Sequence, residues 1–271
     1  MSISLILLAF ALVSEGSLQK IEKGDPVVEQ GQAFQVSFRE KKKNVRLNFL
    51  DQEAPCYLNE SLWECFAAVP ADSKTGEESL KILSGDREIS NLKVKILAVL
   101  FPTETLNLSE DKKALLTHPG REQELKKIRA ALATESQEKF WEGKFIRPVE
   151  GKIESSYGER RWVNGKIKSG YHRGTDIASE ESTPILSFNH GTVLLAGMFI
   201  EEGNMVMVDH GQGLISAYLH LSKIRVKKGQ KIKRGDAVGN VGTTGVVTSP
   251  HLHFGVYIHG TPVNPLFWIN P

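Results

Sequence analysis

The stretch TSPHLHFGVY, residues 248–257, places two histidines one residue apart in an apolar run. On a β-strand, residues i and i+2 point to the same face, so His251 and His253 are predicted to lie side by side. Leu252 and Phe254 would then face the opposite way. An isolated His-x-His is often only a pair of surface histidines on an edge strand. An ordered pair of imidazoles is nevertheless what a metal site or a proton-transfer site requires, provided that the rest of the chain supplies partners.

Two further histidine motifs lie in the same half of the chain. YHRGTDIA contains His172 and Asp176, and Gly174 followed by the β-prone TDIA predicts a loop that enters a strand. SAYLHLS contains His220, with Tyr218 two residues earlier on the same predicted strand face. Each motif alone is weak, because a histidine beside an apolar run is more often a core or edge residue. The other histidines are interpreted in that structural way: His118, His190, His210 and His259.

Together the motifs resemble the LytM/lysostaphin-type zinc metallopeptidases, peptidase family M23, over roughly residues 145–268. The chain carries the H-x-x-x-D of that family at residues 172–176 and its Y-x-H-L-S strand at 218–222. It also carries the run G-x-T-G-x-x-T-x-P-H-L-H-F at 242–254 and the closing VNP at 263–265. The resemblance implies a β-rich zinc peptidase domain in the C-terminal half.

The resemblance also implies roles for five side chains. His172, Asp176 and His253 are expected to bind one Zn²⁺ per chain, while His220 and His251 act on the substrate and the water. Spacing alone does not tell which histidine of HLH binds the metal, so that assignment comes from the resemblance. Two imidazoles and one carboxylate leave a coordination position open, as catalytic zinc sites do.

Many metalloproteases take their general base from the glutamate of an H-E-x-x-H helix. The chain has no such motif, so another side chain must act as the acid–base group. A histidine pair can fill that role, since imidazole titrates near neutral pH. Tyr218 is a candidate hydrogen-bond donor to the oxyanion of the reaction. Packing of Tyr218 beside His220 is an equally good interpretation.

The N-terminal segment, residues 1–19, resembles a secretory signal. Residues 3–13, ISLILLAFALV, form an apolar run too short to span a bilayer and of the length of a signal h-region. The usual basic residues before this run are missing, since Lys20 is the first cation. A buried N-terminal strand is the alternative, although no period-2 polar pattern interrupts the run.

The two cysteines of the chain stand symmetrically about a predicted turn. A two-residue turn at Glu60 and Ser61 would place Cys56 directly opposite Cys65 in a hairpin, close to disulfide distance. With export, a disulfide is expected. The alternative is a reduced, buried pair in a cytosolic protein.

The predicted fold class is mainly β. Residues 25–107 contain short alternating strands, such as 33–38, and predict a β-sandwich-like accessory domain. This region resembles the N-terminal regions of Gram-negative members of the family. Residues 108–144 are charged, rich in helix formers and free of internal proline after Gly120, which predicts a helical connector. Residues 145–271 are predicted to form the LytM/M23 peptidase domain.

The resemblance implies that the protein is a zinc endopeptidase that cuts cross-links or stem peptides of bacterial peptidoglycan. The main alternative is a non-catalytic LytM-like regulator of other wall hydrolases, a class that typically loses metal ligands. A non-haem iron oxygenase also uses two histidines and a carboxylate, but its usual motif is H-x-D.

Peptidoglycan peptides are the expected partner and a regulatory protein partner is left open. The net charge of +2 is too small to indicate nucleic acid. The expected location is the periplasm or cell envelope of a Gram-negative bacterium, without a stable membrane span once the signal is removed.

Overall fold

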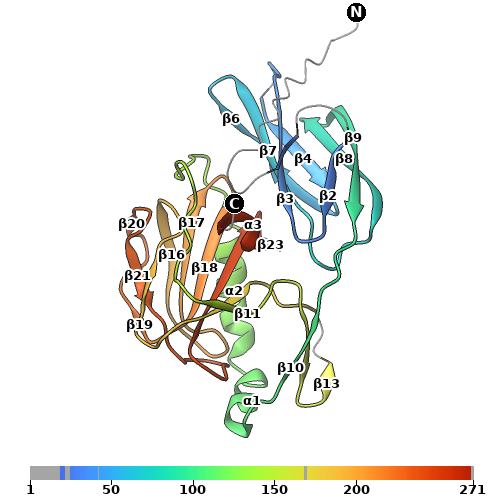
Figure 1. The fold of residues 1–271 in the computed structure, drawn as a ribbon. Coiled ribbons are helices and arrows are strands. Elements are labelled where there is room, and N and C mark those ends of the chain that lie inside the picture. The colour runs from blue at the N-terminus through green and yellow to red at the C-terminus, as the bar shows by residue number, and fades with distance from the viewer. Residues whose placement is uncertain (1–18, 22–24, 42, 168–169, 270–271) are drawn as a thin grey trace, which may run out of the picture.

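The computed structural model of the chain describes residues 19–21, 25–41, 43–167 and 170–269. Apart from Gln19, the predicted signal segment lies outside the described residues. The fold is mainly β, with short helices between an N-terminal and a C-terminal β region, which confirms the predicted fold class (Figure 1). Within the described ranges, no helix has the length and apolar character needed to cross a membrane.

The N-terminal region consists of two sheets that face each other across one apolar core. The first sheet contains, in order, β1 (Gln19–Ile21), β3 (Ala33–Phe38), β7 (Leu62–Ala68) and β6 (Tyr57–Asn59). The second contains β2 (Val27–Glu29), β9 (Arg87–Leu97), β8 (Gly76–Ser84), β4 (Val45–Phe49) and β5 (Gln52–Pro55). Strand β4 alternates buried and exposed residues, so that Val45, Leu47 and Phe49 enter the core shared by both sheets. The arrangement is the sandwich that the alternating sequence predicts.

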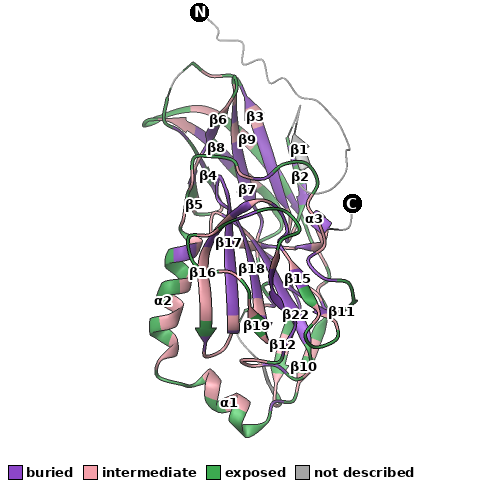
Figure 2. Ribbon diagram, turned by 90° about the vertical axis from the view of Figure 1, so that its left-hand side faces the viewer, coloured by how far each residue is buried: buried purple, intermediate pink, exposed green. Residues whose placement is uncertain are grey.

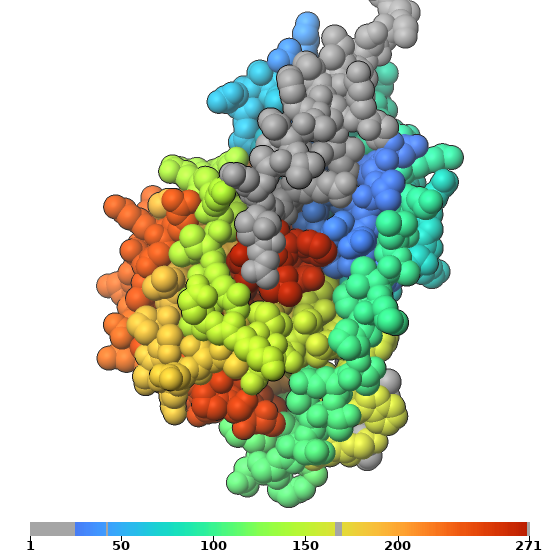
Figure 3. All heavy atoms as spheres, in the orientation of Figure 1, coloured from blue at the N-terminus to red at the C-terminus, as the bar shows by residue number. Residues whose placement is uncertain are grey.

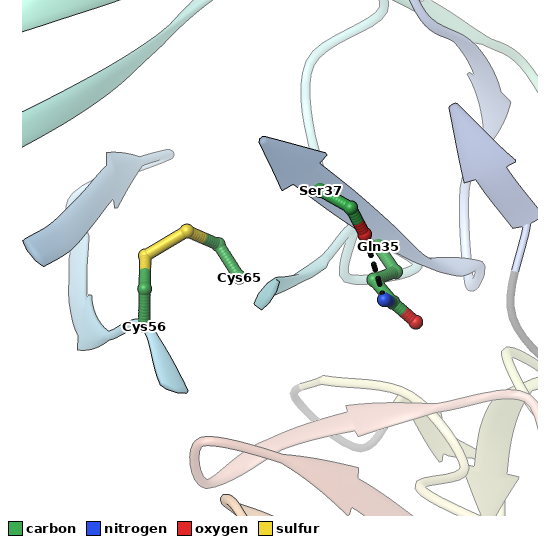
Figure 4. Close-up of a disulfide and its surroundings, with 4 residues drawn as sticks. All are labelled: Gln35, Ser37, Cys56 and Cys65. Carbon is green, nitrogen blue, oxygen red and sulfur yellow. Dashed lines mark hydrogen bonds between the residues drawn. A yellow bond between two sulfur atoms is a disulfide. The ribbon is translucent and has the colours of Figure 1, made fainter. Parts of the chain in front are cut away.

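Strands β6 and β7 form the hairpin that was predicted around the cysteines. Asn59 pairs with Leu62, which leaves Glu60 and Ser61 as a two-residue turn. The turn needs a positive φ, and Glu60 has a φ of 54°. At the open end of this hairpin Cys56 and Cys65 are joined in a disulfide (Figure 4). Both cysteines are buried in the sandwich core, beside the strand that carries Gln35 and Ser37.

The connector begins with β10 (Thr103–Leu106) and continues through helices α1 (Glu110–Leu116) and α2 (Arg121–Leu132). It runs along the C-terminal region to the end farthest from the sandwich (Figures 1 and 3). The helical prediction for residues 133–144 is wrong, because this segment joins the C-terminal sheet instead. The Ser136 hydroxyl bonds to the Asp209 carboxylate, and the Phe140 amide donates to the His210 carbonyl over 2.9 Å. Thr134 and Ser136 have a low helix propensity and favour helix ends. The tertiary hydrogen bonds therefore determine the conformation of this segment.

The C-terminal region is built on an eight-stranded sheet. Its strands, in order, are β11 (Lys152–Ser155), β14 (Thr175–Ala178), β22 (His251–Ile258), β18 (Leu214–Leu221), β17 (Gly203–Gly211), β16 (Gly191–Phe199) and β20 (Lys231–Ile232), with β23 (Thr261–Val263) paired to β22. Strands β15 (Pro184–Leu186), β21 (Ala237–Asn240) and β19 (Lys223–Ile224) form a smaller sheet beside it. Strand β10 pairs with β12 (Arg160–Val163), which pairs with β13 (Lys166–Ile167), and α3 (Leu266–Ile269) follows β23.

The two faces of the eight-stranded sheet have different roles. One face is buried in the main core, and Figure 2 shows β17, β18 and β22 as largely buried strands. Leu252 and Phe254 of β22 belong to the same core cluster as Tyr57 and Phe66 of the N-terminal region. Tyr57 of the sandwich stacks on His259 with ring centroids 6.0 Å apart, so the two β regions share this contact. The other face carries the histidine motifs and is partly covered by α2. The predicted domain boundaries at 25–107 and 145–271 stay a prediction.

His210 is one of the histidines that were given a structural interpretation, and it links β17 to its neighbours. Its Nδ1 lies 2.7 Å from the His190 carbonyl, and its Nε2 lies 2.8 Å from the Ser216 hydroxyl. Complete burial lowers the pKa of His210 from its ordinary 6.5 to about 4. The side chain is therefore neutral in the folded protein at physiological pH.

We expect this histidine to make the protein less stable in mild acid. Between pH 6.5 and about 4 the unfolded chain binds a proton that folded His210 does not, so the free energy of unfolding falls as the pH falls through this window. The loss should amount to about 3 kcal/mol for this site and level off below pH 4. Urea unfolding at pH 7.5, 6, 5 and 4 measures it. His210→Asn, which does not titrate, should flatten the slope, and an unchanged slope would contradict the assignment.

Candidate metal and catalytic site

The sheet register brings the two ends of the metal motif together. In the β14–β22 pair, Asp176 lies opposite His253 and Ala178 lies opposite His251. Because Leu252 points into the main core, both histidines point to the other face, as the alternation predicts. Asp176 shares that face, and His172 reaches it from the loop that precedes β14. Residues distant in sequence thus meet on one surface of the sheet.

Three nitrogen and oxygen atoms converge at this point. The Oδ1 atom of Asp176 lies 3.1 Å from Nε2 of His172 and 2.7 Å from Nδ1 of His253. The two histidine nitrogens are 2.9 Å apart. All three residues are buried, and their ligand atoms lie within 4.8 Å of one another. This is the arrangement of a group that could hold a metal ion.

Hydrogen bonds orient the first of these imidazoles. Nδ1 of His172 lies 3.0 Å from the carbonyl oxygen of Ser156. A carbonyl only accepts, so Nδ1 carries the hydrogen and the lone pair of Nε2 points toward Asp176 and His253. A backbone carbonyl on the far nitrogen is the usual outer support of a metal-binding histidine.

The charge state of Asp176 suits a ligand. Burial by itself raises the pKa of this carboxyl, but the neighbouring His172 and His253 outweigh that effect and hold the pKa well below its usual value. The second oxygen, Oδ2, accepts a bond of 2.7 Å from Nη2 of Arg161. One oxygen therefore faces the histidines while the other is held from behind. Arg161 belongs to none of the sequence motifs, because a single arginine in a β-rich stretch has no recognisable spacing to its partner.

His220 reaches the site through an irregularity in β18. Between the pairs Asn204–Leu221 and Val206–Tyr218, Met205 alone stands opposite both Leu219 and His220. This β-bulge gives His220 a φ of 66° and turns its side chain to the face that carries the metal group. The prediction that Tyr218 and His220 share a face is wrong, because it assumed an unbroken strand.

The imidazoles of His220 and His251 stand next to each other, with ring centroids 5.2 Å apart. Nδ1 of His220 lies 3.0 Å from the Thr244 carbonyl, and Nδ1 of His251 lies 2.9 Å from the Ser249 carbonyl. Both rings therefore carry their hydrogen on Nδ1 and keep a lone pair on Nε2. Nε2 of His251 is 3.9 Å from Oδ1 of Asp176. Burial, and then His253 and His251, lower the pKa of His220 well below its usual value, so His220 is neutral.

Tyr218 lies on the opposite side of the sheet. Its ring is completely buried in the main core and packs on Phe254 at a centroid distance of 5.4 Å. Its hydroxyl accepts bonds from the Phe188 amide and the Ser216 hydroxyl, over 2.8 and 3.0 Å. The structure brings four histidines and Asp176 together, but it does not bring Tyr218 to them. The expected oxyanion role therefore has no support in this geometry.

The three potential metal ligands, His172, Asp176 and His253, and the two further histidines line a cleft of about 490 Å³. One wall is helix α2, whose apolar side chains Leu125, Ile128 and Leu132 line the cleft. The floor comes from β17, β18 and β22, and the lining also includes charged side chains, among them Arg173 and Glu202. Ligand-binding clefts typically combine an apolar lining with a few polar groups, as this cleft does.

The fold and the donor set together define a metallopeptidase-type domain. Residues 170–265 match the family model described as Peptidase family M23, and this part of the chain is an M23 domain. The M23 resemblance that the sequence motifs carried is thereby confirmed.

Two known proteins match this chain over part of its length. The peptidoglycan DD-endopeptidase ShyA of Vibrio cholerae is 41% identical over 121 residues, which cover 44% of this chain and 28% of ShyA. The cell division protein DipM of Caulobacter vibrioides is 41% identical over 113 residues, which cover 41% of this chain and 18% of DipM. The chain thus spans less than a third of either relative.

A crystal structure from Pseudomonas aeruginosa that is assigned to peptidase M23 resembles most of the chain. Its TM-score is 0.67 at 28% sequence identity, over 89% of this chain and 93% of the other. The likeness therefore extends beyond the M23 domain to the β region and connector that precede it.

Proposed function

We propose that this protein is a zinc-dependent endopeptidase that hydrolyses peptide bonds in bacterial peptidoglycan. The observation that carries the proposal is the convergence of His172, Asp176 and His253 beside two further imidazoles in a single cleft. The DD-endopeptidase activity named for ShyA supports the substrate class.

The donor set fits zinc. Two imidazole nitrogens and one carboxylate oxygen are the ligand types that catalytic zinc sites use, and they leave a fourth position open. A lone pair of His172 and a carboxylate oxygen of Asp176 point at the same small volume as Nδ1 of His253. When bound, zinc supplies a Lewis acid that lowers the pKa of a coordinated water to about 7 and polarises a carbonyl oxygen.

The two remaining histidines are proposed to move protons. Nε2 of His251 and Nε2 of His220 carry lone pairs, because both Nδ1 atoms donate to backbone carbonyls. Either Nε2 can accept a proton from the attacking water and later deliver it to the leaving amine. Once protonated, the same nitrogens can donate to the developing oxyanion, a role that Tyr218 is too far inside the core to fill.

The regulator alternative fits the site less well. Non-catalytic LytM-like regulators typically lose metal ligands, whereas this chain keeps the complete group and both neighbouring imidazoles in the open cleft. Export to the cell envelope is part of the proposal. It is supported by the Cys56–Cys65 disulfide and by the peptidoglycan activity named for ShyA.

Digestion of purified peptidoglycan tests the proposed function. With about one equivalent of zinc, the protein should release soluble wall fragments, and mass spectrometry of the muropeptides that a muramidase then liberates from them should show newly hydrolysed peptide bonds. A chelator should abolish the release and added zinc should restore it. Release that a chelator does not affect would contradict the zinc mechanism. No release by zinc-loaded protein would favour the regulator alternative.

A further inference from the structure

Arg161 stands behind the metal group and has three partners at once. Its Nη2 bonds to Oδ2 of Asp176 over 2.7 Å, and its Nε bonds to Oε2 of Glu104 over 2.9 Å. Nη2 also lies 3.0 Å from the Ser155 hydroxyl. Strand β12 alternates exposed and partly buried residues, so Arg161 points inward while Arg160 points to solvent. The Arg161 side chain is 21% exposed and that of Asp176 is 10% exposed, so solvent screens this pair only weakly.

Glu104 comes from a distant part of the sequence. It belongs to β10, which follows the N-terminal sandwich and pairs in parallel with β12 so that Glu104 lies beside Arg161. Both residues lie outside the residues 170–265 that match the family model. Ser155 ties the pair to the first histidine ligand as well, since its hydroxyl lies 3.2 Å from Oε2 of Glu104 and 3.1 Å from Nδ1 of His172.

We propose that Arg161 is a positioning residue for the metal ligand Asp176 and that Glu104 positions Arg161. A carboxylate has two oxygens that can reach a cation. By holding Oδ2, Arg161 leaves Oδ1 as the single ligand atom and fixes the plane of the carboxylate. Glu104 holds the guanidinium in place and, together with Asp176, offsets its positive charge near the cation.

The inference rests on the proposed zinc site and adds a connection to the first half of the chain. Metal affinity would depend on a side chain that the sandwich-to-helix connector supplies, although that connector holds no metal ligand of the proposed set. Outer partners of metal ligands typically contribute about 10–100-fold to metal affinity, which sets the size of the expected effect.

Zinc affinity of the full-length protein, measured by competition with a chromophoric chelator, tests the proposal. Arg161→Gln should bind zinc about 10–100-fold more weakly than the wild type. The zinc affinity of Arg161→Lys should lie between those of Arg161→Gln and the wild type. The lysine ammonium keeps the charge but does not reproduce the planar, forked set of donors of the guanidinium. Glu104→Gln should show a smaller loss. The matched control is Arg160→Gln, on the exposed face of the same strand, which should bind as the wild type does.

A double mutant separates positioning from a general structural role. If Glu104 acts through Arg161, then Glu104→Gln combined with Arg161→Gln should bind zinc as weakly as Arg161→Gln alone. If the double variant instead lost zinc affinity by the product of the two single losses, Glu104 would not act through Arg161. The visible spectrum of the Co²⁺-substituted protein gives a second readout, because a freed Oδ2 that joins the metal raises the coordination number. Circular dichroism verifies that each variant is folded.

The outcomes distinguish this inference from the proposed function. If the wild type binds no zinc, the proposed metal site itself is wrong. If the wild type binds zinc, Asp176→Ala does not, and Arg161→Gln binds as tightly as the wild type with an unchanged Co²⁺ spectrum, then the positioning role alone is wrong.

Discussion

Replacing His172, Asp176 or His253 by alanine is expected to remove bound zinc and wall-cleaving activity together. Each variant keeps two of the three converging ligand atoms, which is too few for a catalytic zinc site. Zinc should fall from about one per chain to near zero, and muropeptide release should fall to the background of the chelated wild type. Elemental analysis after gel filtration, alongside muropeptide release, measures both quantities.

Two variants control for effects other than ligand loss. Asp176→Asn keeps the volume of the side chain but not its charge, so it should lose most of the zinc without the cavity that alanine leaves. His118→Ala removes an exposed histidine on the connector and should keep both zinc and activity. If His251→Ala lost its zinc while His253→Ala kept it, the assignment within HLH would be reversed.

Replacing His220 or His251 by alanine is expected to leave zinc in place and still remove most of the activity. Neither residue belongs to the converging ligand group, and in both the hydrogen-bonded Nδ1 leaves Nε2 free to act on water and substrate. A positioned acid–base group typically contributes about 10²–10⁴-fold, so the rate should fall by that factor. Initial rates of muropeptide release, with zinc content determined on the same samples, give the comparison.

The two histidines also stand close enough to share a proton-transfer role. Their ring centroids are 5.2 Å apart, so we expect the double alanine variant to lose less than the product of the two single losses. Activity that survives in both single variants would place the acid–base group elsewhere in the cleft. Loss of zinc in either variant would mean that the ligand group is larger than three residues.

Much of the site followed from local sequence. The alternation of β22 is sufficient to place His251 and His253 on one face, because Leu252 and Phe254 must enter the core. The loop at Gly174 followed by a strand at TDIA was predicted and is observed in β14. The hairpin with Cys56 and Cys65 follows in the same way from the residues of its turn. These features depend on neighbours within one strand or turn, so a single sequence carries enough information to predict them.

Other features could not be predicted because they depend on strands that meet only in the folded chain. The bulge at His220 reverses the face of that residue, and nothing in SAYLHLS marks the extra residue. The end of the connector helix at Leu132 depends on bonds from Ser136 and Phe140 to β17. Helix propensity alone is a weak guide where such tertiary bonds compete with it.

The sequence by itself determined the β class, the hairpin with its cysteine pair, and the set of side chains that could bind a metal. Only the tertiary structure decided how these side chains are used. It turned Tyr218 into the core, brought His220 to the cleft through a bulge, and placed Arg161 and Glu104 behind Asp176. The physical reason is that alternation and turn chemistry act between residues a few positions apart, whereas strand register joins residues that are distant in the chain.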